Sequence, residues 1–289
     1  MSPDHRSAGR ADPAAGSPPP PPITSLTNPR VKAAVRLRDR RERDETGLTI
    51  LDGAREIRRA LDAGVRVETA FVAPDLLRTP DAFAVEERLR HRPTTIGVTP
   101  AVLAKVAFGE RSDGIVAIVE TPRMGLADLA LPDDALVVVV EGVEKPGNLG
   151  AVLRTADAAG AHAVIAADPR TDLFNPNAIR ASIGTIFGLP VVAATSAETL
   201  AWLAEQGIRP VAALVDAPTD YTAADLSGPV AIVLGSEADG LTSAWRDSAV
   251  LPVSIPMRGR ADSLNVSIAA AVLLFEAVRQ RRAGPDAAD

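Results

Sequence analysis

The sequence predicts an α/β fold with a parallel sheet in the second half of the chain, and three observations lead to this prediction. Residues 136–140 (LVVVV) and 230–234 (VAIVL) are short apolar runs rich in β-branched side chains. Strands of a parallel sheet that helices cover on both faces have this composition. Glycine-containing loops follow both runs, and segments of helical character alternate with them. The chain has 289 residues, of which 46% are hydrophobic, enough for one large domain or two ordinary ones.

The first part of the chain predicts a smaller α/β domain. Strands are expected at residues 48–51, 67–73, 95–98 and 115–119, and helices at residues 54–63, 81–91 and 100–107. Prolines and a glycine follow, so residues 122–134 are the expected linker. The expected domains are therefore residues 23–121 and residues 135–283.

A basic segment precedes the first strand of this domain. Residues 30–43 contain seven basic side chains and two acidic ones, although the net charge of the chain is −6. Asn28 and Pro29 suit the start of one helix across this segment. Its inward stripe would be Val31, Ala34 and Val35. A solvated charged face and a contact with nucleic-acid phosphates both fit this pattern. The candidate RNA-binding cations are Arg30, Lys32, Arg36 and Arg40.

The second domain continues as alternating strands and helices. Helices are expected at residues 151–159, 177–187 and 197–206, and further strands at residues 163–166, 191–192 and 211–215. The loop at residues 141–150 lacks the G-x-G-x-x-G spacing of a dinucleotide-binding fingerprint. With Asn148 as the cap of the next helix, Arg154 would lie on its second turn, and both would border one crevice at the end of the strand. Taken singly, Asn148 also fits an ordinary cap and Arg154 a surface charge.

The loop after the strand at residues 230–234 reads GSEADGLT. Its two glycines invite comparison with the P-loop G-x-x-x-x-G-K-[ST], but Leu241 stands at the lysine position. Glu237 and Asp239 would also repel phosphates, so the P-loop interpretation is rejected. What remains is a glycine-lined turn that lets a ligand approach the backbone, with a carboxylate beside it.

The last helix is apolar on nearly every face. Residues 268–275 form an apolar run of eight, well short of the roughly 18 that a membrane span needs. Such a helix is covered on all sides, by its own core or by a partner subunit. Ser263 or Asn265 would cap it beside a polar pocket.

Composition excludes several kinds of chemistry. The absence of cysteine excludes disulfides, thiolate metal sites and a cysteine nucleophile. The three histidines lie outside the loops described above, so histidine acid–base chemistry is not expected. Without the pattern of a signal peptide, we expect a cytoplasmic protein. The proline-rich residues 1–22 and the tail at residues 284–289 are expected to be disordered.

Three motifs carry a resemblance to a known family. They read NLGAVLRTA (148–156), VLGSEADGL (233–241) and IPMRGRADSLNVSIAAA (255–271). In this order they resemble the motifs of the SpoU (TrmH-like) RNA 2′-O-ribose methyltransferases, a family of the SPOUT superfamily. Residues 177–191 are similar to the intermediate segment of that family, and residues 23–121 to its small substrate-binding domain. Two departures are Ala238, where glycine is common, and Thr185, where a smaller residue is usual.

The resemblance implies a parallel-sheet methyltransferase domain tied in a trefoil knot and a homodimer through the C-terminal helix, where Leu273 and Leu274 would be buried. S-adenosyl-L-methionine would lie bent in the knot, and no metal is required. The implied cofactor-binding residues are Leu214, Gly235, Ile255, Leu264 and Asn265. The implied catalytic residues are Asn148, Arg154, Glu237, Ser263 and Asn265.

The function that the resemblance implies is methylation of a ribose 2′-hydroxyl in RNA. A separate domain ahead of the knot favours 23S ribosomal RNA, with antibiotic resistance neither affirmed nor excluded. The alternatives are a transfer RNA 2′-O-methyltransferase and a non-catalytic RNA-binding or ribosome-assembly protein of the same fold. Because a guanidinium stays protonated, Arg154 would clamp a substrate phosphate, and that phosphate or Glu237 would accept the proton.

Overall fold

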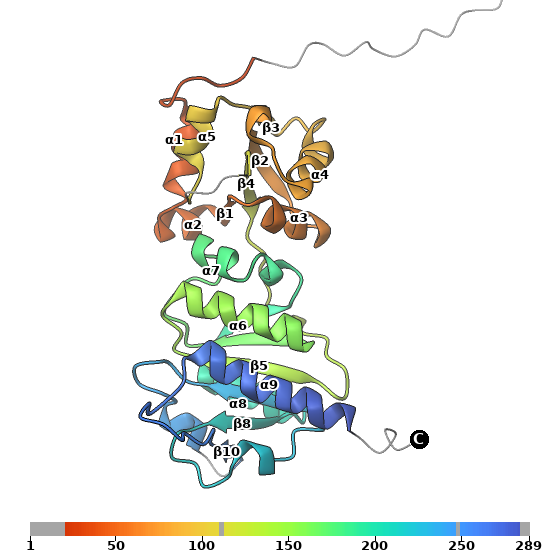
Figure 1. Ribbon diagram of the computed structural model, residues 1–289, viewed down its shortest axis with the longest axis vertical. Coiled ribbons are helices and arrows are strands. Elements are labelled where there is room, and N and C mark those ends of the chain that lie inside the picture. Colours follow the sequence, from red (N-terminus) through yellow and green to blue (C-terminus); the bar gives the residue numbers. More distant parts are fainter. Residues whose placement is uncertain (1–20, 110–112, 247–248, 284–289) are drawn as a thin grey trace, which may run out of the picture.

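The computed structural model describes residues 21–109, 113–246 and 249–283. Of the residues expected to be disordered (1–22 and 284–289), 1–20 and 284–289 lie outside the described residues. The chain forms two lobes along one long axis (Figure 1), one with a four-stranded sheet and one with a six-stranded sheet. The α/β fold class predicted from the sequence is confirmed.

The first lobe contains a mixed sheet in the order β1-β4-β2-β3. Its strands are β1 (Leu48–Leu51), β2 (Val67–Val72), β3 (Thr95–Gly97) and β4 (Ile115–Glu120). Only β2 and β3 pair in parallel, whereas β4 is antiparallel to both β1 and β2. One face is covered by α1 (Pro29–Arg36) and α5 (Pro100–Val106), and the other by α3 (Ala54–Asp62) and α4 (Pro80–Leu89).

The basic segment forms two helices, so the single helix expected there is wrong. The chain stops being helical after α1, and α2 (Arg40–Thr46) begins a second helix. Asp39 is extended, with φ −83° and ψ 135°, and its carboxylate accepts a hydrogen bond from the Arg41 N–H. That side chain caps a new helix, because an aspartate competes with the preceding helix for backbone donors. The start of α1 at Pro29, with Asn28 as its cap, is confirmed.

The second lobe contains a parallel sheet in the order β10-β8-β9-β5-β6-β7. Its strands are β5 (Leu136–Glu141), β6 (Ala163–Ala167), β7 (Val191–Ala194), β8 (Arg209–Ala213), β9 (Val230–Leu234) and β10 (Leu251–Val253). Every neighbouring pair is parallel, which confirms the prediction. The short strand β10 was not anticipated because Pro252 interrupts its apolar pattern, and proline is confined to positions such as this sheet edge.

Helices cover both faces of this sheet. On one face lie α6 (Pro146–Ala159) and α9 (Val266–Arg282), which pack against alternate residues of β5 and β9. On the other face lie α8 (Ser196–Glu205) and the short η5 (Ser243–Arg246), which buries Trp245. Across the described ranges of the chain, no helix is both long and apolar enough to cross a membrane.

The helix expected at residues 177–187 is interrupted. It consists of α7 (Pro176–Ala181) and the 3-10 turn η3 (Thr185–Phe187). Between them, Ile183 and Gly184 adopt φ values of 51° and 82°, which end the helix. The Ile183 carbonyl accepts a hydrogen bond of 2.8 Å from Arg59 of α3, so the interruption lies at the junction with the first lobe.

The two lobes share one hydrophobic core and several polar contacts. Apolar side chains of α3 belong to the same buried cluster as those of α6 and η3. Arg43, only 6% exposed, pairs with Asp172, and Thr49 donates a 2.8 Å hydrogen bond to the Phe174 carbonyl. The expected linker carries η2 (Leu126–Asp128) and packs its leucines against the second lobe. This junction fixes the first lobe relative to the sheet of the second.

The C-terminal end of α9 provides a test of this packing. The Arg281 guanidinium donates hydrogen bonds to the carbonyls of Asp134, Ala135, Leu226 and Gly228. We expect Arg281→Ala to lower the free energy of unfolding by about 1–3 kcal/mol, because partly buried carbonyls lose their donors. Urea unfolding measures the change, and Arg282→Ala, at the exposed neighbouring position, is the control that should change little. Equal midpoints for both variants would contradict this role.

Candidate active site

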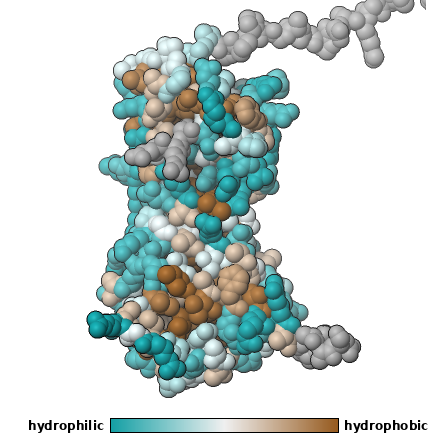
Figure 2. All heavy atoms as spheres, viewed as in Figure 1, coloured by the Kyte–Doolittle hydropathy of each residue, from teal (hydrophilic) through white to brown (hydrophobic). Residues whose placement is uncertain are grey.

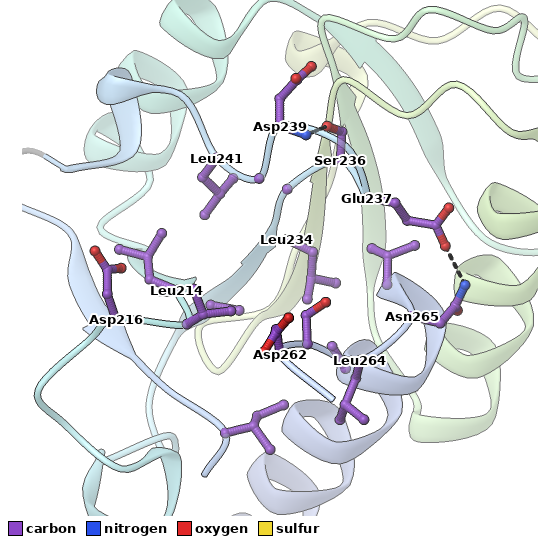
Figure 3. A pocket seen from close by; sticks show the side chains of 18 of the residues that line it. Leu214, Asp216, Leu234, Ser236, Glu237, Asp239, Leu241, Asp262, Leu264 and Asn265 are labelled. Atoms are coloured by element: carbon purple, nitrogen blue, oxygen red, sulfur yellow. Dashed lines mark hydrogen bonds between the residues drawn. The ribbon is translucent and has the colours of Figure 1, made fainter. Parts of the chain in front are cut away.

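A large cavity lies at the carboxyl edge of β8, β9 and β10. It has a volume of about 600 Å³ and is formed by residues 213–216, 234–241 and 255–269 (Figure 3). In open parallel sheets, ligands bind outside the carboxyl ends of the strands, where the strand order reverses. The cavity therefore has both the position and the size of a small-molecule site.

Most of the cavity wall is apolar, and charged or polar side chains line it at several points. The apolar side chains are Leu214, Leu234, Leu241, Ile255, Leu264 and Val266. Glu237 and Asn265 stand together at one end, here called the polar end, whereas Asp216, Asp239 and Asp262 lie elsewhere on the wall (Figure 3). All the residues predicted to bind the cofactor line this one cavity, namely Leu214, Gly235, Ile255, Leu264 and Asn265. Ser263, predicted to be catalytic, lines it as well.

The loop after β9 folds back tightly on itself. The Ser236 N–H donates to the Gly240 carbonyl at 3.2 Å, and the Gly240 N–H donates to the Ser236 carbonyl at 3.1 Å. A Cβ atom at Gly235 would lie 2.2 Å from the Gly240 carbonyl carbon and 2.4 Å from the Leu241 nitrogen. Gly235 is therefore required by the close approach of two backbone segments, a different reason from the ligand approach that the sequence suggested.

Three predicted site residues from three separate motifs meet at the polar end. Asn265 caps α9, since its Oδ1 accepts hydrogen bonds from the Ser267 N–H (3.0 Å) and the Ser267 hydroxyl (2.7 Å). Its Nδ2 donates to Glu237 Oε1 and, at 3.4 Å, to Asn148 Oδ1. Of the two residues proposed as the cap, Asn265 is confirmed and Ser263 is not.

Lys145 completes this cluster and was missed by sequence reasoning. Its Nζ lies 2.6 Å from Glu237 Oε2, opposite the oxygen that Asn265 contacts. The hydrogen bond from Lys145 is the main cause that lowers the pKa of Glu237, and the same contact raises the pKa of Lys145. Lys145 stands three residues before Asn148, outside the motif at residues 148–156, and nothing in the sequence marks it as a partner of Glu237.

Arg154 does not join the cluster within one chain. The helix begins at Pro146, not after Asn148 as expected, because Pro146 occupies its first position and Lys145 its cap. Asn148 is therefore inside α6, and a separation of six residues places Arg154 about 120° away around the helix. Arg154 is exposed and lines neither the main cavity nor the small one beside Asn148. The expectation that both residues border one crevice is wrong for a single chain.

The predicted RNA-binding cations all lie on the surface of the first lobe. Arg30, Lys32, Arg36 and Arg40 are exposed. Arg36 pairs with Glu42 at 2.9 Å, and Arg40 donates a 3.3 Å hydrogen bond to the Arg170 carbonyl of the second lobe. The described residues contain no group of three or more histidine, aspartate or glutamate side chains that could hold a metal ion.

Solved structures define the class of protein to which this fold and site correspond. A crystal structure of an RNA 2′-O ribose methyltransferase superposes with a TM-score of 0.79 and 44% identity, over 90% of this chain and 98% of that one. The SpoU methyltransferase AviRb from Streptomyces viridochromogenes, solved in complex with AdoMet, has a TM-score of 0.79 and 32% identity, over 89% and 99% of the two chains.

Sequence comparisons identify the family. Residues 135–275 match the SpoU rRNA Methylase family, and residues 28–117 match the MRM3-like substrate binding domain. A 23S rRNA (uridine(2479)-2′-O)-methyltransferase of Streptomyces viridochromogenes is 34% identical over 257 residues, which cover 86% of this chain and 88% of that protein. The 23S rRNA (guanosine-2′-O-)-methyltransferase RlmB of Ralstonia nicotianae is 40% identical over 188 residues, 63% of this chain and 76% of that protein. The chain belongs to the SpoU family of RNA methyltransferases.

Proposed function

We propose that this protein transfers a methyl group from S-adenosyl-L-methionine to a ribose 2′-hydroxyl of 23S ribosomal RNA. The observation that carries the proposal is that Glu237 and Asn265, which line a largely apolar cavity, meet beside Asn148 of the first motif. Relatives that cover most of this chain are methyltransferases of that RNA, which supports the choice of substrate.

The cavity fits the cofactor in size and in chemistry. Its volume of about 600 Å³ and its apolar walls suit a nucleoside, and the polar end suits the charged amino-acid part. Backbone groups around Leu214, Gly235, Ile255 and Leu264 would hold the adenosine, and Asn265 would face the amino-acid end. When bound, the cofactor supplies a methyl group on a sulfonium. We further propose that residues 233–241 and 255–265 form a trefoil knot around it.

The chain's contribution to the reaction is to orient the hydroxyl and to direct its proton. Both oxygens of Glu237 already accept hydrogen bonds, and its pKa is lowered by Lys145, so Glu237 is a weak proton acceptor. In our proposal Arg154 holds a substrate phosphate beside the reacting ribose, since the guanidinium fork matches phosphate geometry. The hydroxyl proton would pass to water through that phosphate or through Glu237. Asn148 and Ser263 would orient the hydroxyl.

The outward face of α9 suggests how two chains associate. Ile268 and Phe275 are 52% and 49% exposed and lie seven residues apart, on one side of the helix. Figure 2 shows a hydrophobic patch over the layer that α6 and α9 form. Leu273 and Leu274, expected in the interface, are instead 0% exposed in the core of their own chain. We propose a homodimer through Ile268 and Phe275. In this dimer Arg154, which lies on the exposed side of the neighbouring helix α6, would reach the partner's cavity.

A charged residue on this face should separate the dimer. We expect Phe275→Glu to shift the protein from dimer to monomer in analytical ultracentrifugation, because a carboxylate would lose its water in an apolar interface. Phe83→Glu is the matched control, since Phe83 is 55% exposed in the first lobe and far from α9. A monomeric unsubstituted protein at micromolar concentration would contradict the proposed dimer.

RNA would reach the site across the first lobe. The exposed cations of α1 and α2 would contact its phosphates in this proposal. The hydrogen bond from Arg40 to the Arg170 carbonyl, which brings α2 next to the second lobe, supports it. A cytoplasmic location follows from this substrate.

The assay of the proposed function is cofactor-dependent methylation of unmodified 23S ribosomal RNA, with transfer RNA as the competing substrate. Binding of RNA without methyl transfer would instead identify a non-catalytic ribosome-assembly protein.

A further inference from the structure

The carboxylate of Glu237 is held from two sides by different elements. Lys145, which caps α6, places its Nζ 2.6 Å from Oε2, and Asn265, which caps α9, donates its amide to Oε1. The Lys145 carbonyl accepts from the Asn148 N–H at 3.0 Å and from the Leu149 N–H at 3.2 Å, so its backbone is fixed by the helix start. Glu237 thus ties the beginnings of both helices to the loop after β9.

This arrangement determines the orientation of the Asn265 amide. Oδ1 is committed to capping α9 through Ser267, so only Nδ2 is available to face the cavity rim. An ionised Glu237 accepts from that Nδ2, whereas a protonated or displaced carboxyl would lose or weaken the contact. Lys145, the cation that keeps Glu237 ionised and in place, therefore acts on Asn265 through Glu237.

We infer that Lys145 is a positioning residue of the methyl-transfer site, which it serves by holding Glu237 so that Glu237 fixes the Asn265 amide at the cavity rim. The inference rests on the proposed function for its effect on turnover, but its effect on cofactor binding does not depend on the RNA substrate. Lys145 itself would contact neither the cofactor nor the hydroxyl.

The competing interpretation is that Lys145 binds an RNA phosphate directly. Two features of the site oppose it. The ammonium is already paired with Glu237, and Glu144, the preceding residue, would repel a phosphate. The neighbouring cation Arg170 is likewise paired, with Glu144 and with Asp239 of the same loop. Both cations beside this loop therefore face carboxylates.

A double-mutant cycle separates the two interpretations. The variants are Lys145→Met, Lys145→Arg, Glu237→Gln and the double substitution Lys145→Met with Glu237→Gln. Arg66→Met is the matched control, because Arg66 is 71% exposed and pairs with Glu120 at 3.0 Å, much as Lys145, 70% exposed, pairs with Glu237. For each variant, three quantities are measured. They are the affinity for S-adenosyl-L-methionine by calorimetric titration, the rate constant for methylation of 23S ribosomal RNA, and the KM for that RNA.

We expect Lys145→Met to weaken cofactor binding and slow methylation by about tenfold each, and Lys145→Arg to restore both to within about threefold. The double variant should be no worse than Glu237→Gln alone, because Lys145 acts only through that carboxylate. Two results would overturn the inference in favour of a phosphate contact. One is a loss of activity in the double variant equal to the product of the two single losses. The other is a Lys145→Met defect confined to the KM for RNA and to the salt dependence of that KM.

The pH dependence of cofactor affinity supplies a readout that a merely structural role would not change. The Lys145 contact lowers the pKa of Glu237, so the carboxylate stays ionised as the pH falls, and binding weakens only when it is protonated. In Lys145→Met the fall in affinity should begin at a higher pH, nearer the ordinary range of a glutamate, within a titration from about pH 3 to pH 7. An unchanged profile would count against the inference. If the unsubstituted protein binds the cofactor but methylates no RNA, the proposed function fails, and this binding profile still decides the role of Lys145.

Discussion

Replacing Arg154 with either alanine or lysine should slow methyl transfer by roughly a hundredfold, about 2.7 kcal/mol of activation free energy. The proposed role is a clamp on a substrate phosphate, which needs the planar fork of the guanidinium as well as its charge. Cofactor affinity should change little, since Arg154 lines no part of the cavity in its own chain and its proposed contact in the partner's site is with the RNA phosphate. Single-turnover methylation at saturating cofactor, paired with calorimetry, measures both quantities. Arg55→Lys, at an exposed position of α3, should retain the full rate.

Mixed dimers test whether Arg154 serves the partner's cavity. A dimer that combines one Arg154→Ala chain with one Asn265→Ala chain would contain one intact site if the guanidinium crosses the interface. Such mixtures should recover a substantial part of the activity that each variant alone lacks. A mixture no more active than its parents would mean that Arg154 acts within its own chain or not at all, and wild-type rates for Arg154→Lys would refute the clamp.

Substituting Gly235 with alanine should lower the affinity for S-adenosyl-L-methionine by about a hundredfold, or roughly 2.7 kcal/mol of binding free energy. The added Cβ would lie 2.2 Å and 2.4 Å from backbone atoms of Gly240 and Leu241, so the loop that lines the cavity must move. Calorimetric titration gives the affinity, and thermal unfolding shows whether the fold persists.

Gly228→Ala is the control for this substitution. Gly228 precedes the same strand, β9, but a Cβ there would meet no atom within 4 Å. Its affinity for the cofactor should match that of the unsubstituted protein. If Gly235→Ala also binds normally, the loop after β9 does not hold the cofactor, and the site assignment is wrong.

Elements that face one environment along their length were predictable from the sequence. The strand expected at residues 230–234 matches β9 at both ends, because a strand buried on both faces leaves an unbroken apolar run. The parallel sheet of the second lobe was predicted from such apolar runs. The predicted cofactor-binding residues, all of which line the cavity, came from the family resemblance. The carboxylate of Glu237 and the amide of Asn265 lie together as the motifs implied.

Details that depend on packing were not predictable. Apolar residues occupy nearly every face of α9, so their spacing could not distinguish the buried Leu273 and Leu274 from the exposed Ile268 and Phe275. The expected position of Arg154 depended on where α6 begins, and helix boundaries are the weakest part of a sequence interpretation. Lys145 carried no signal of its own, because an ion pair between residues 92 positions apart in the chain exists only in the fold.

Mapping of 2′-O-methyl groups in ribosomal RNA tests the central claim most directly. RNA from cells with and without the gene would be compared nucleotide by nucleotide, and the missing methyl group restored in vitro with the purified protein and S-adenosyl-L-methionine. We predict that one ribose of 23S ribosomal RNA loses its methyl group without the gene and regains it with the protein, but not with the Arg154→Ala variant. Unchanged 23S ribosomal RNA, with a methyl group lost from transfer RNA or from no RNA at all, would contradict the account.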